Sequence, residues 1–486
     1  MKLRTFIFII LPTLILSCSM PTDVQPTATS TVTKQVINTP AISQTIPPTV
    51  ETPIIPDHEK YILDTTIDYD LHRVDVNETI EYPNHTGQAV TSLTLAVSAN
   101  LWADCFHLYE VNVDGNPITD YSLNLHQLDL PLQTPLEPES VSTLTLHFSL
   151  SLPYMDQVHS QRARIFGYSE VQMNLVNWYP FIVPFKDGDW VIHEPWSHGE
   201  YLVYPLADFE VDLKFADAAN PPVVAASGYA EPNRDSTRYT LQNGRAFAIS
   251  ASREFQVSQM QVDDTTVYSY YLPLYKNAGE AALLASAQAL QVFSQRFGKY
   301  PHKTLSVVIA DFHDSMEFSA LYFHSRSFYD LYDGTNKNYL TIVAVHETGH
   351  QWWFEQVAND QAEEPWLDES LTTYSELIYY ETLYPELVPW WWSYRVDFFQ
   401  PNGDIDISVY QGQNADTYKA IVYLNGAHFL KDLRERVGDD AFFAFLQDYL
   451  SQEKNGIATS DDFFRILDEH TTTDYSDVVR TYFSKR

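Results

Sequence analysis

Cysteine is scarce in this chain of 486 residues, which contains only Cys18 and Cys105. A disulfide framework is therefore excluded, and the stability of the folded chain has to come from the burial of apolar surface. Apolar residues make up 45% of the sequence, and its length is sufficient for two or three domains with large cores.

Basic residues are also few. The chain has 29 Lys and Arg against 64 Asp and Glu, which gives a formal net charge of −35. Such a surface repels the phosphates of nucleic acids and anionic lipid headgroups, so we expect no nucleic-acid partner. A solvated, soluble exterior is the simplest interpretation of the acidic excess.

Long hydrophobic runs are missing, apart from a short one at the N-terminus. Residues 6–16 are apolar and follow a positively charged start, but the run is too short for a membrane span and is typical of a secretory signal. The end of this segment, residues 15–18, resembles a bacterial lipobox. We therefore expect 1–18 to be a lipoprotein signal peptide and Cys18 to carry a lipid. This predicts an extracytoplasmic protein, lipid-anchored to the bacterial cell membrane, with simple secretion as the alternative.

Only Cys105 remains after this assignment, so we expect no disulfide in the mature protein. Residues 19–57 are rich in Thr, Pro, Ser and Gln, with few large apolar residues and almost no charge. Such a segment cannot bury enough surface to offset the entropy of ordering. The sequence therefore predicts a disordered tether that holds the folded part away from the membrane.

Short strands separated by turn signals begin near residue 61. Apolar and polar residues alternate with a period of two in 61–66, 91–97, 109–113 and 141–148. Strands of this length and spacing predict an antiparallel β domain, which we place at 58–258.

The periodicity changes in the second half of the chain. Residues 281–297 carry Ala, Leu and Val at helical spacing, and 305–310 form a predicted strand. Further helical patterns occupy 427–436 and 440–450. We therefore predict a mixed α/β, mainly helical domain at 259–486, and a multidomain α+β fold for the whole chain.

One motif in this domain carries metal chemistry. His346 and His350 lie four residues apart in an apolar helical segment, so both imidazoles project from one face and can bind one ion. Glu347, between them, can reach a water at that ion without ligating it. Zinc requires a third protein ligand, and Glu369 can supply it after a gap of eighteen residues.

Residues 346–353 and 366–370 resemble the signature of the aminopeptidase N family of gluzincin peptidases, with Ser370 in place of the usual glycine. The resemblance implies that His346, His350 and Glu369 bind one Zn²⁺ and that Glu347 is the catalytic base. It also implies a thermolysin-like catalytic domain behind the N-terminal β domain.

Two further segments are similar to motifs of the same family. Residues 314–318, Asp-Ser-Met-Glu-Phe, resemble its G-x-M-E-N strand, which implies that Glu317 binds the α-ammonium group of the substrate. Residues 423–426 resemble its Y-x-K-G segment, which implies that Tyr423 donates a hydrogen bond to the oxyanion of the transition state. Tyr418 is the alternative for that role.

Three other residues receive weaker assignments. Gln172 is the nearest candidate for a second group that holds the substrate N-terminus. Glu376 lies seven residues after Glu369, on nearly the same helix face, and can orient a ligating histidine. Asp368 should point away from the face that Glu369 presents.

The resemblance implies a zinc-dependent aminopeptidase that hydrolyses N-terminal residues from peptides. Two alternatives remain open from the sequence. Asp314 stands where the family has glycine, and a narrowed cleft there would favour an endopeptidase or another hydrolase on the same zinc site. The second alternative is a catalytically inactive, surface-binding lipoprotein that has kept its metal ligands.

Overall fold

The computed structural model describes residues 55–155, 165–312 and 314–486. The predicted signal peptide, the lipid site at Cys18 and nearly all of the predicted tether lie outside the described residues. No helix in the described ranges is long and apolar enough to cross a membrane.

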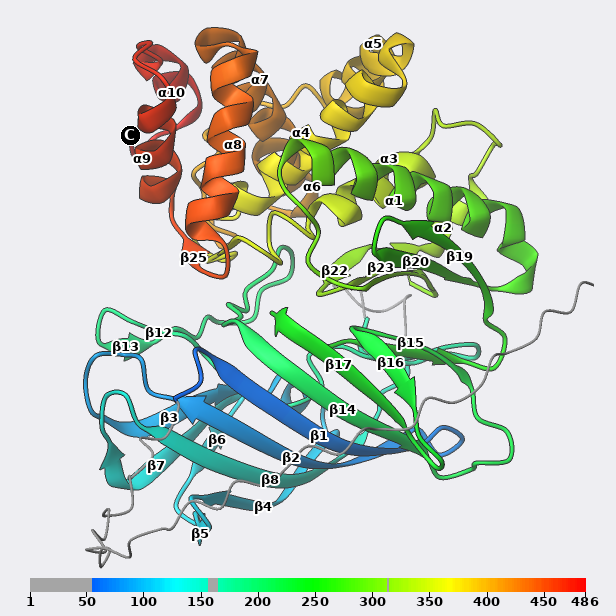
Figure 1. Cartoon of the computed structure of the whole chain (residues 1–486), viewed down its shortest axis with the longest axis vertical. Coiled ribbons are helices and arrows are strands. Elements are labelled where there is room, and N and C mark those ends of the chain that lie inside the picture. The colour runs from blue at the N-terminus through cyan, green and yellow to red at the C-terminus, as the bar shows by residue number, and fades with distance from the viewer. Residues whose placement is uncertain (1–54, 156–164, 313) are drawn as a thin grey trace, which may run out of the picture. The chain divides into compact units, whose positions relative to one another are not determined.

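The N-terminal part of the described chain is built on an eight-stranded sheet (Figure 1). Strand β1 pairs in parallel with β14, and the other neighbours are antiparallel. In β8 every second residue from Ser142 to Leu150 is buried, which is the alternation that the sequence predicts. The strand order is β16 (Tyr229–Pro232), β17 (Thr237–Gly244), β14 (Ala207–Phe215), β1 (Glu59–Asp68), β2 (Arg73–Pro83), β8 (Val141–Ser151), β4 (Phe106–Val113), β5 (Asn116–Pro117).

Two four-stranded sheets and a short hairpin complete this β domain. The four strands predicted for it all overlap observed strands, with ends that differ by up to three residues. The first sheet has the order β15 (Val223–Ala226), β18 (Ile249–Ser252), β10 (Met173–Leu175), β9 (Gly167–Tyr168). The second has β11 (Phe181–Ile182), β3 (Val90–Ala96), β7 (Gln127–Leu136), β6 (Ser122–Asn124), and the hairpin is β12 (Phe185–Lys186) with β13 (Asp189–Trp190).

The catalytic part begins with a five-stranded mixed sheet, whose strand β22 lies at an edge (Figure 1). Its order is β19 (Gln256–Val262), β20 (Thr265–Tyr271), β21 (Thr304–Ala310), β23 (Leu321–Ser325), β22 (Met316–Phe318). Because β19 starts at Gln256, the domain boundary predicted after residue 258 falls inside this strand. A short parallel pair, β24 (Ala358–Asn359) and β25 (Ile457–Ala458), lies among the helices.

Helices make up most of the catalytic part. They are α1 (Lys276–Arg296), α2 (Arg326–Asp330), α3 (Tyr339–Gly349), α4 (Trp366–Leu383), α5 (Val388–Trp391), α6 (Ala415–Lys419), α7 (Gly426–Val437), α8 (Asp439–Glu453), α9 (Ser460–His470) and α10 (Ser476–Tyr482). A π-helical segment, η6 (Ala420–Asn425), joins α6 to α7. Helix α1 packs against β19, β20 and α3, and α4 packs against α3 and α7. The predicted α+β fold class, with a β domain before a mainly helical catalytic domain, is confirmed.

Candidate active site

Helix α3 positions the two histidines. The Asn338 side chain caps its N-terminus by accepting from the Thr341 N–H, and the helix is apolar on nearly every side, so it is buried in the core. His346 lies in its last turn, and His350 follows its last residue while still donating its backbone N–H to the His346 carbonyl. Both imidazoles therefore project from one end of a buried, rigid element.

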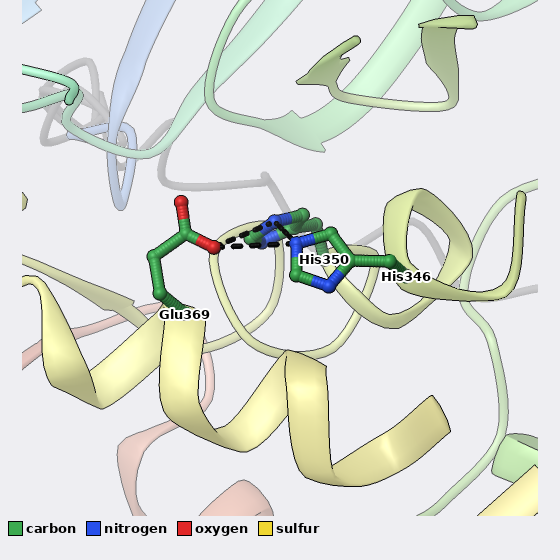
Figure 2. Close-up of side chains that lie close together, drawn as sticks. All are labelled: His346, His350 and Glu369. Carbon is green, nitrogen blue, oxygen red and sulfur yellow. Dashed lines mark hydrogen bonds and ion pairs between the residues drawn. The ribbon is translucent and has the colours of Figure 1, made fainter. Parts of the chain in front are cut away.

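Helix α4 brings the third ligand to them (Figure 2). Glu369 lies in its first turn, and its Oε2 is 3.3 Å from His346 Nε2 and 3.5 Å from His350 Nε2. The two Nε2 atoms are 3.2 Å apart. Three donor atoms from two packed helices thus converge within reach of one ion, as the spacing of the residues predicts.

The hydrogen bonds behind the histidines decide which ring nitrogen faces the triad. His346 Nδ1 lies 2.9 Å from Glu376 Oε1, and His350 Nδ1 lies 3.1 Å from the Trp353 carbonyl. Because these oxygens only accept, each Nδ1 carries the hydrogen and each Nε2 presents a lone pair. Two lone pairs and a carboxylate oxygen that face one another require a cation between them, so the donor set fits zinc.

The balance of charge around the triad also favours a cation. The Oε2 atoms of Glu347 and Glu369 are buried and have no hydrogen-bond partner among the described residues. Burial raises the pKa of Glu347, and the neighbouring Glu317 and Glu369 carboxylates add to the rise against the effect of His350. Burial opposes the ionisation of Glu369, but the two imidazoles outweigh it and hold its pKa well below the usual range. The unpartnered carboxylate oxygens of this cluster therefore favour a bound cation.

Glu317 lies beside the triad, on the edge strand β22. Glu317 is 6% exposed. Glu317, His350 and Asp368 each have one possible metal-ligand atom, and these three atoms lie within 4.8 Å of one another. Gln361 Nε2 connects two of these carboxylates, since it lies 3.2 Å from Glu317 Oε1 and 2.8 Å from Asp368 Oδ2. The prediction that Asp368 points away from the site is therefore wrong: its carboxylate turns back to the helix N-terminus, where it also accepts from the Glu369 N–H.

Of the two candidate tyrosines, Tyr423 is the one that lines the cleft above the triad. It lies in η6, its hydroxyl donates to Glu369 Oε1, and its ring stacks on His346 with centroids 5.8 Å apart. Burial raises the pKa of the Tyr423 phenol well above its usual value, and Glu369 adds to the rise, so the phenol keeps its proton. Tyr418 is fully buried behind it, against His198.

Gln172 does not reach the site, so its assignment to the substrate N-terminus is wrong. Both polar atoms of its amide already have hydrogen-bond partners within the fold. Nε2 donates to Ser250 Oγ and the Ile309 carbonyl, and Oε1 accepts from the Asp311 N–H. A different residue of the β domain, Glu200, lines the cleft beside Glu317.

Glu200 lies in the irregular segment between β13 and β14, which the catalytic domain holds in place. His193 Nε2 lies 2.9 Å from Asp360 Oδ2, and Tyr410 donates to the Glu194 carbonyl at 2.8 Å. No motif or periodicity marks this segment in the sequence, and its position follows only from these tertiary contacts.

Two adjoining cavities open at the site. The larger, of about 610 Å³, lies over the triad and is lined by Glu347, Tyr423 and the segment 314–317, among others. The smaller, of about 280 Å³, is mostly apolar and is lined by Trp102, Phe166, Phe354 and other side chains beyond Glu317. A chain end anchored at Glu317 could therefore place its first side chain in the apolar cavity.

Comparisons with known proteins agree with this geometry. Residues 281–482 match the family described as the Peptidase family M1 domain. Aminopeptidase M1-B of Oryza sativa subsp. japonica is 25% identical over 236 residues, which are 46% of this chain and 27% of the rice protein. Aminopeptidase N of Lactobacillus helveticus is 24% identical over 308 residues, 57% of this chain and 36% of that protein. The matched segments thus span about a third or less of these relatives.

Comparison of folds finds a similarity that also includes the β domain. The crystal structure of an M1 zinc metallopeptidase from Deinococcus radiodurans superposes with a TM-score of 0.62 at 16% identity, over 88% of this chain and 93% of that chain. The His-His-Glu triad, together with the family match, places the site in the gluzincin class of zinc metallopeptidases. Within that class, residues 281–482 match the M1 peptidase domain and the chain is similar to aminopeptidase N, and these matches imply a single catalytic zinc ion.

Proposed function

We propose that this protein is a zinc-dependent aminopeptidase that removes N-terminal residues from peptides. The observation that carries the proposal is the position of Glu317, a buried carboxylate with an oxygen within 4.8 Å of a nitrogen of the metal-site residue His350. An α-ammonium group bound there lies one residue from the metal centre, so the bond presented for hydrolysis is the first peptide bond. The Deinococcus relative has also been crystallised with a Tyr-Ser-Ala substrate.

His346, His350 and Glu369 would hold the zinc ion, which when bound polarises the scissile carbonyl and lowers the pKa of a water molecule to about 7. Glu347 then accepts a proton from the attacking water and delivers it to the leaving amine. Burial among other carboxylates raises the pKa of Glu347, which suits a group that has to gain and lose a proton near neutral pH.

Tyr423 stabilises the oxyanion. Its hydroxyl donates to Glu369 in the free protein, and it exchanges that acceptor for the substrate oxygen as charge develops there. Glu317 binds the ammonium group, and Gln361 holds the Glu317 carboxylate in place from behind.

The test compares leucine p-nitroanilide with its N-acetylated form. We expect the free amine to be hydrolysed at least about 100-fold more efficiently, because a buried carboxylate left without an ammonium partner is costly. Glu317→Ala should remove most of that ratio, whereas Glu386→Ala, at an exposed position after α4, should keep it. Equal turnover of both substrates by the wild type would favour the endopeptidase alternative.

An inactive binding protein is the other alternative. The retention of Glu347 beside an intact ligand set supports an enzyme. A purified protein that contains one zinc ion per chain and hydrolyses neither anilide nor a panel of free and blocked peptides would favour the inactive alternative.

We further propose that the mature protein is anchored to the membrane through a lipid on Cys18. Support comes only from the sequence: the signal-like segment and the lipobox that ends at Cys18. Metabolic labelling with palmitate should mark the wild type and not Cys18→Ala. An unlabelled wild-type protein in the culture medium would favour secretion.

A further inference from the structure

The cleft over the metal site is lined by an excess of acidic side chains. Among the described residues that line it, and apart from histidines, two side chains are cationic, Arg395 and Lys419. The acidic residues that line it are Glu200, Asp314, Glu317, Glu347, Glu369 and Asp416. A peptide bound there carries a negative charge at its C-terminus, which these acidic side chains repel. A cation that is free to bind this carboxylate would therefore determine which peptides bind well.

Arg395 already forms an ion pair with Glu376. Its Nε donates to Glu376 Oε2 at 3.0 Å and its Nη2 to Oε1 at 2.9 Å, while the same carboxylate orients His346. This fork-to-carboxylate pair holds the guanidinium in the wall of the cleft. Arg395 therefore acts on the metal site and is not available to a substrate.

Lys419 is differently placed. Its Nζ is 3.7 Å from Asp314 Oδ1, which is longer than a hydrogen bond, and its side chain is 50% exposed. Asp314 raises the pKa of Lys419 most, and Glu200 and Glu369 add to the rise against the effect of burial, so the amine is charged at neutral pH. Lys419 is thus a charged group at the cleft with a loosely held counter-ion.

The position of Lys419 relative to Glu317 follows from the edge strand. Residues 314–317 all line the cleft over the triad, whereas Phe318 lines only the adjoining apolar cavity. A peptide that lies along this edge with its amine at Glu317 therefore runs toward Asp314, where Lys419 faces it. Three extended residue steps separate Glu317 from Asp314, or about 10 Å, which is also about the length of an extended tripeptide.

We propose that Lys419 binds the C-terminal carboxylate of short peptides, of about three residues, and so gives the cleft a preference for them. The proposal rests on the aminopeptidase function proposed above. In the free protein Asp314 occupies Lys419 as a counter-ion, and the peptide carboxylate replaces it. The aspartate at the position where the family has glycine then tunes the strength of carboxylate binding rather than blocking the cleft.

The experiment compares Leu-Gly-Gly with its C-terminal amide by measuring kcat/KM for each. We expect wild type to prefer the free acid by about 10-fold, the size of a partly exposed charge-assisted hydrogen bond, with the difference mainly in KM. Lys419→Met should bring the ratio of acid to amide to about one, and Lys419→Arg should keep most of it. Lys276→Met, an equal charge change on α1, should leave the ratio at the wild-type value.

Peptide length and Asp314 provide two independent checks. A hexapeptide and its amide should be hydrolysed equally by wild type, because its carboxylate lies beyond Lys419. Asp314→Asn should raise the preference for the tripeptide acid, because the counter-ion no longer competes. An equal ratio of acid to amide in wild type and Lys419→Met would overturn the proposal, as would the same ratio for tripeptide and hexapeptide.

A binding measurement separates this proposal from the proposed function. Calorimetry with zinc-loaded Glu347→Gln measures the affinity for tripeptide acid and amide without turnover. If Glu347→Gln binds the acid more tightly than the amide, and the double variant with Lys419→Met does not, carboxylate recognition by Lys419 is supported. This holds even if the wild type hydrolyses no peptide. If the affinities for acid and amide are equal while the wild type is an active aminopeptidase, the proposed role of Lys419 is wrong and the proposed function stands.

Discussion

Tyr423 exchanges its hydrogen-bond acceptor in the proposed mechanism. Its hydroxyl donates to Glu369 in the free protein and would donate to the substrate oxyanion in the transition state. We expect Tyr423→Phe to lower kcat by about 10²- to 10³-fold with little change in KM, because the contact is made in the transition state. Steady-state kinetics on leucine p-nitroanilide, with the zinc content measured in parallel, test this.

Two other tyrosines serve as comparisons for Tyr423. Tyr394→Phe alters an exposed residue and should leave kcat within about two-fold of wild type. If Tyr418→Phe lost as much kcat as Tyr423→Phe, the assignment of the oxyanion donor would be wrong.

Glu376 controls the other side of the metal site. It accepts from His346 Nδ1, from Trp391 Nε1 at 3.0 Å and from Arg395, and it is fully buried. We expect Glu376→Gln to weaken zinc binding by about 10- to 100-fold, because the carboxylate fixes the tautomer and orientation of His346. Competition with a fluorescent chelator measures the affinity.

The matched control for Glu376 is Glu381→Gln, which removes a carboxylate that pairs with Arg434 near the other end of α4. This variant should bind zinc like the wild type. An unchanged affinity in Glu376→Gln would show that His346 needs no carboxylate behind it.

Sequence reasoning succeeded where one helix sets the geometry, and failed where a distant segment does. The spacing of His346 and His350 fixes their common face, and the position of Glu376 follows from the same periodicity. Gln172 was misassigned because its partners, Ser250 and Ile309, come from strands far along the chain. Asp368 was misassigned because the N–H groups at the start of α4 attract its carboxylate.

At the scale of elements, α4 and α7 pack at a point where there is no room for a side chain. A Cβ atom on Gly426 would clash with the Ser370 side chain and lie 3.3 Å from Ser370 Cα. Ser370 Oγ donates to the Val422 carbonyl at 2.6 Å, so it cannot easily move away. We expect Gly426→Ala to lower the free energy of unfolding by about 1–3 kcal/mol, as measured by urea denaturation.

A second substitution identifies the cause of that loss. Ser370→Gly in the Gly426→Ala background removes the side chain that clashes, and should recover part of the lost stability. Simple additivity of the Gly426 and Ser370 substitutions would contradict the proposed clash.

Strand β1 contains a group that makes stability depend on pH. Burial raises the pKa of Glu59 to about 8, against the effect of the Tyr61 hydroxyl that donates to it. The folded protein therefore holds one proton more than the unfolded chain between the ordinary glutamate pKa of about 4.3 and about 8. The contribution of Glu59 to stability is complete below that range and is lost as the pH rises through about 8.

We therefore expect Glu59→Gln to flatten the fall in stability between pH 5 and 8, by up to about 1.4 kcal/mol per pH unit. Urea denaturation at a series of pH values measures the slope. The control Glu110→Gln, on the exposed side of β4, should retain the wild-type slope. A slope that does not change in Glu59→Gln would contradict the protonated state of Glu59 in the folded protein.

The boundaries of elements were less predictable than their existence. Helix α1 begins at Lys276, five residues before the predicted start, although its first turn contains Gly279. Glycine disfavours a helix, so the pattern gave no reason to extend it. The structure explains the extension, because the Tyr271 ring of β20 packs where a side chain at Gly279 would lie. Tertiary packing here overrides local propensity.

At the scale of the whole molecule, the two predicted domains share one compact unit of contacts. Alternation and helical periodicity predict the fold class, strands first and mainly helices after them, because each property is local. The contribution of the β domain to the cleft was not predicted. Glu200 lines the cleft with Glu317 because segments about 170 residues apart are in contact, for example at His193 and Asp360. Domain assignment from a sequence therefore says little about a site that both domains line.

Arg245 provides the strongest test of that coupling. It follows β17, is 2% exposed, and donates to the Tyr204 carbonyl and, in the catalytic domain, to the carbonyls of Glu355 at 3.1 Å and Gly456 at 2.7 Å. Burial lowers its pKa to about 10, so it is still charged at neutral pH. Arg245→Met keeps much of the volume but leaves these buried carbonyls unpaired, and we expect a loss of about 3–5 kcal/mol in the free energy of unfolding.

Urea denaturation followed by circular dichroism and by tryptophan fluorescence tests the role of Arg245. Because the described residues form one unit, both probes should give one coincident transition in the wild type. In Arg245→Met we expect a lower midpoint and transitions that separate, because the β domain and the catalytic domain lose a shared buried group. Arg253→Met breaks a surface pair with Asp70, which solvent screens, and should lower the midpoint far less than Arg245→Met does. Equal losses in the two variants would mean that Arg245 does not couple the two halves of the molecule.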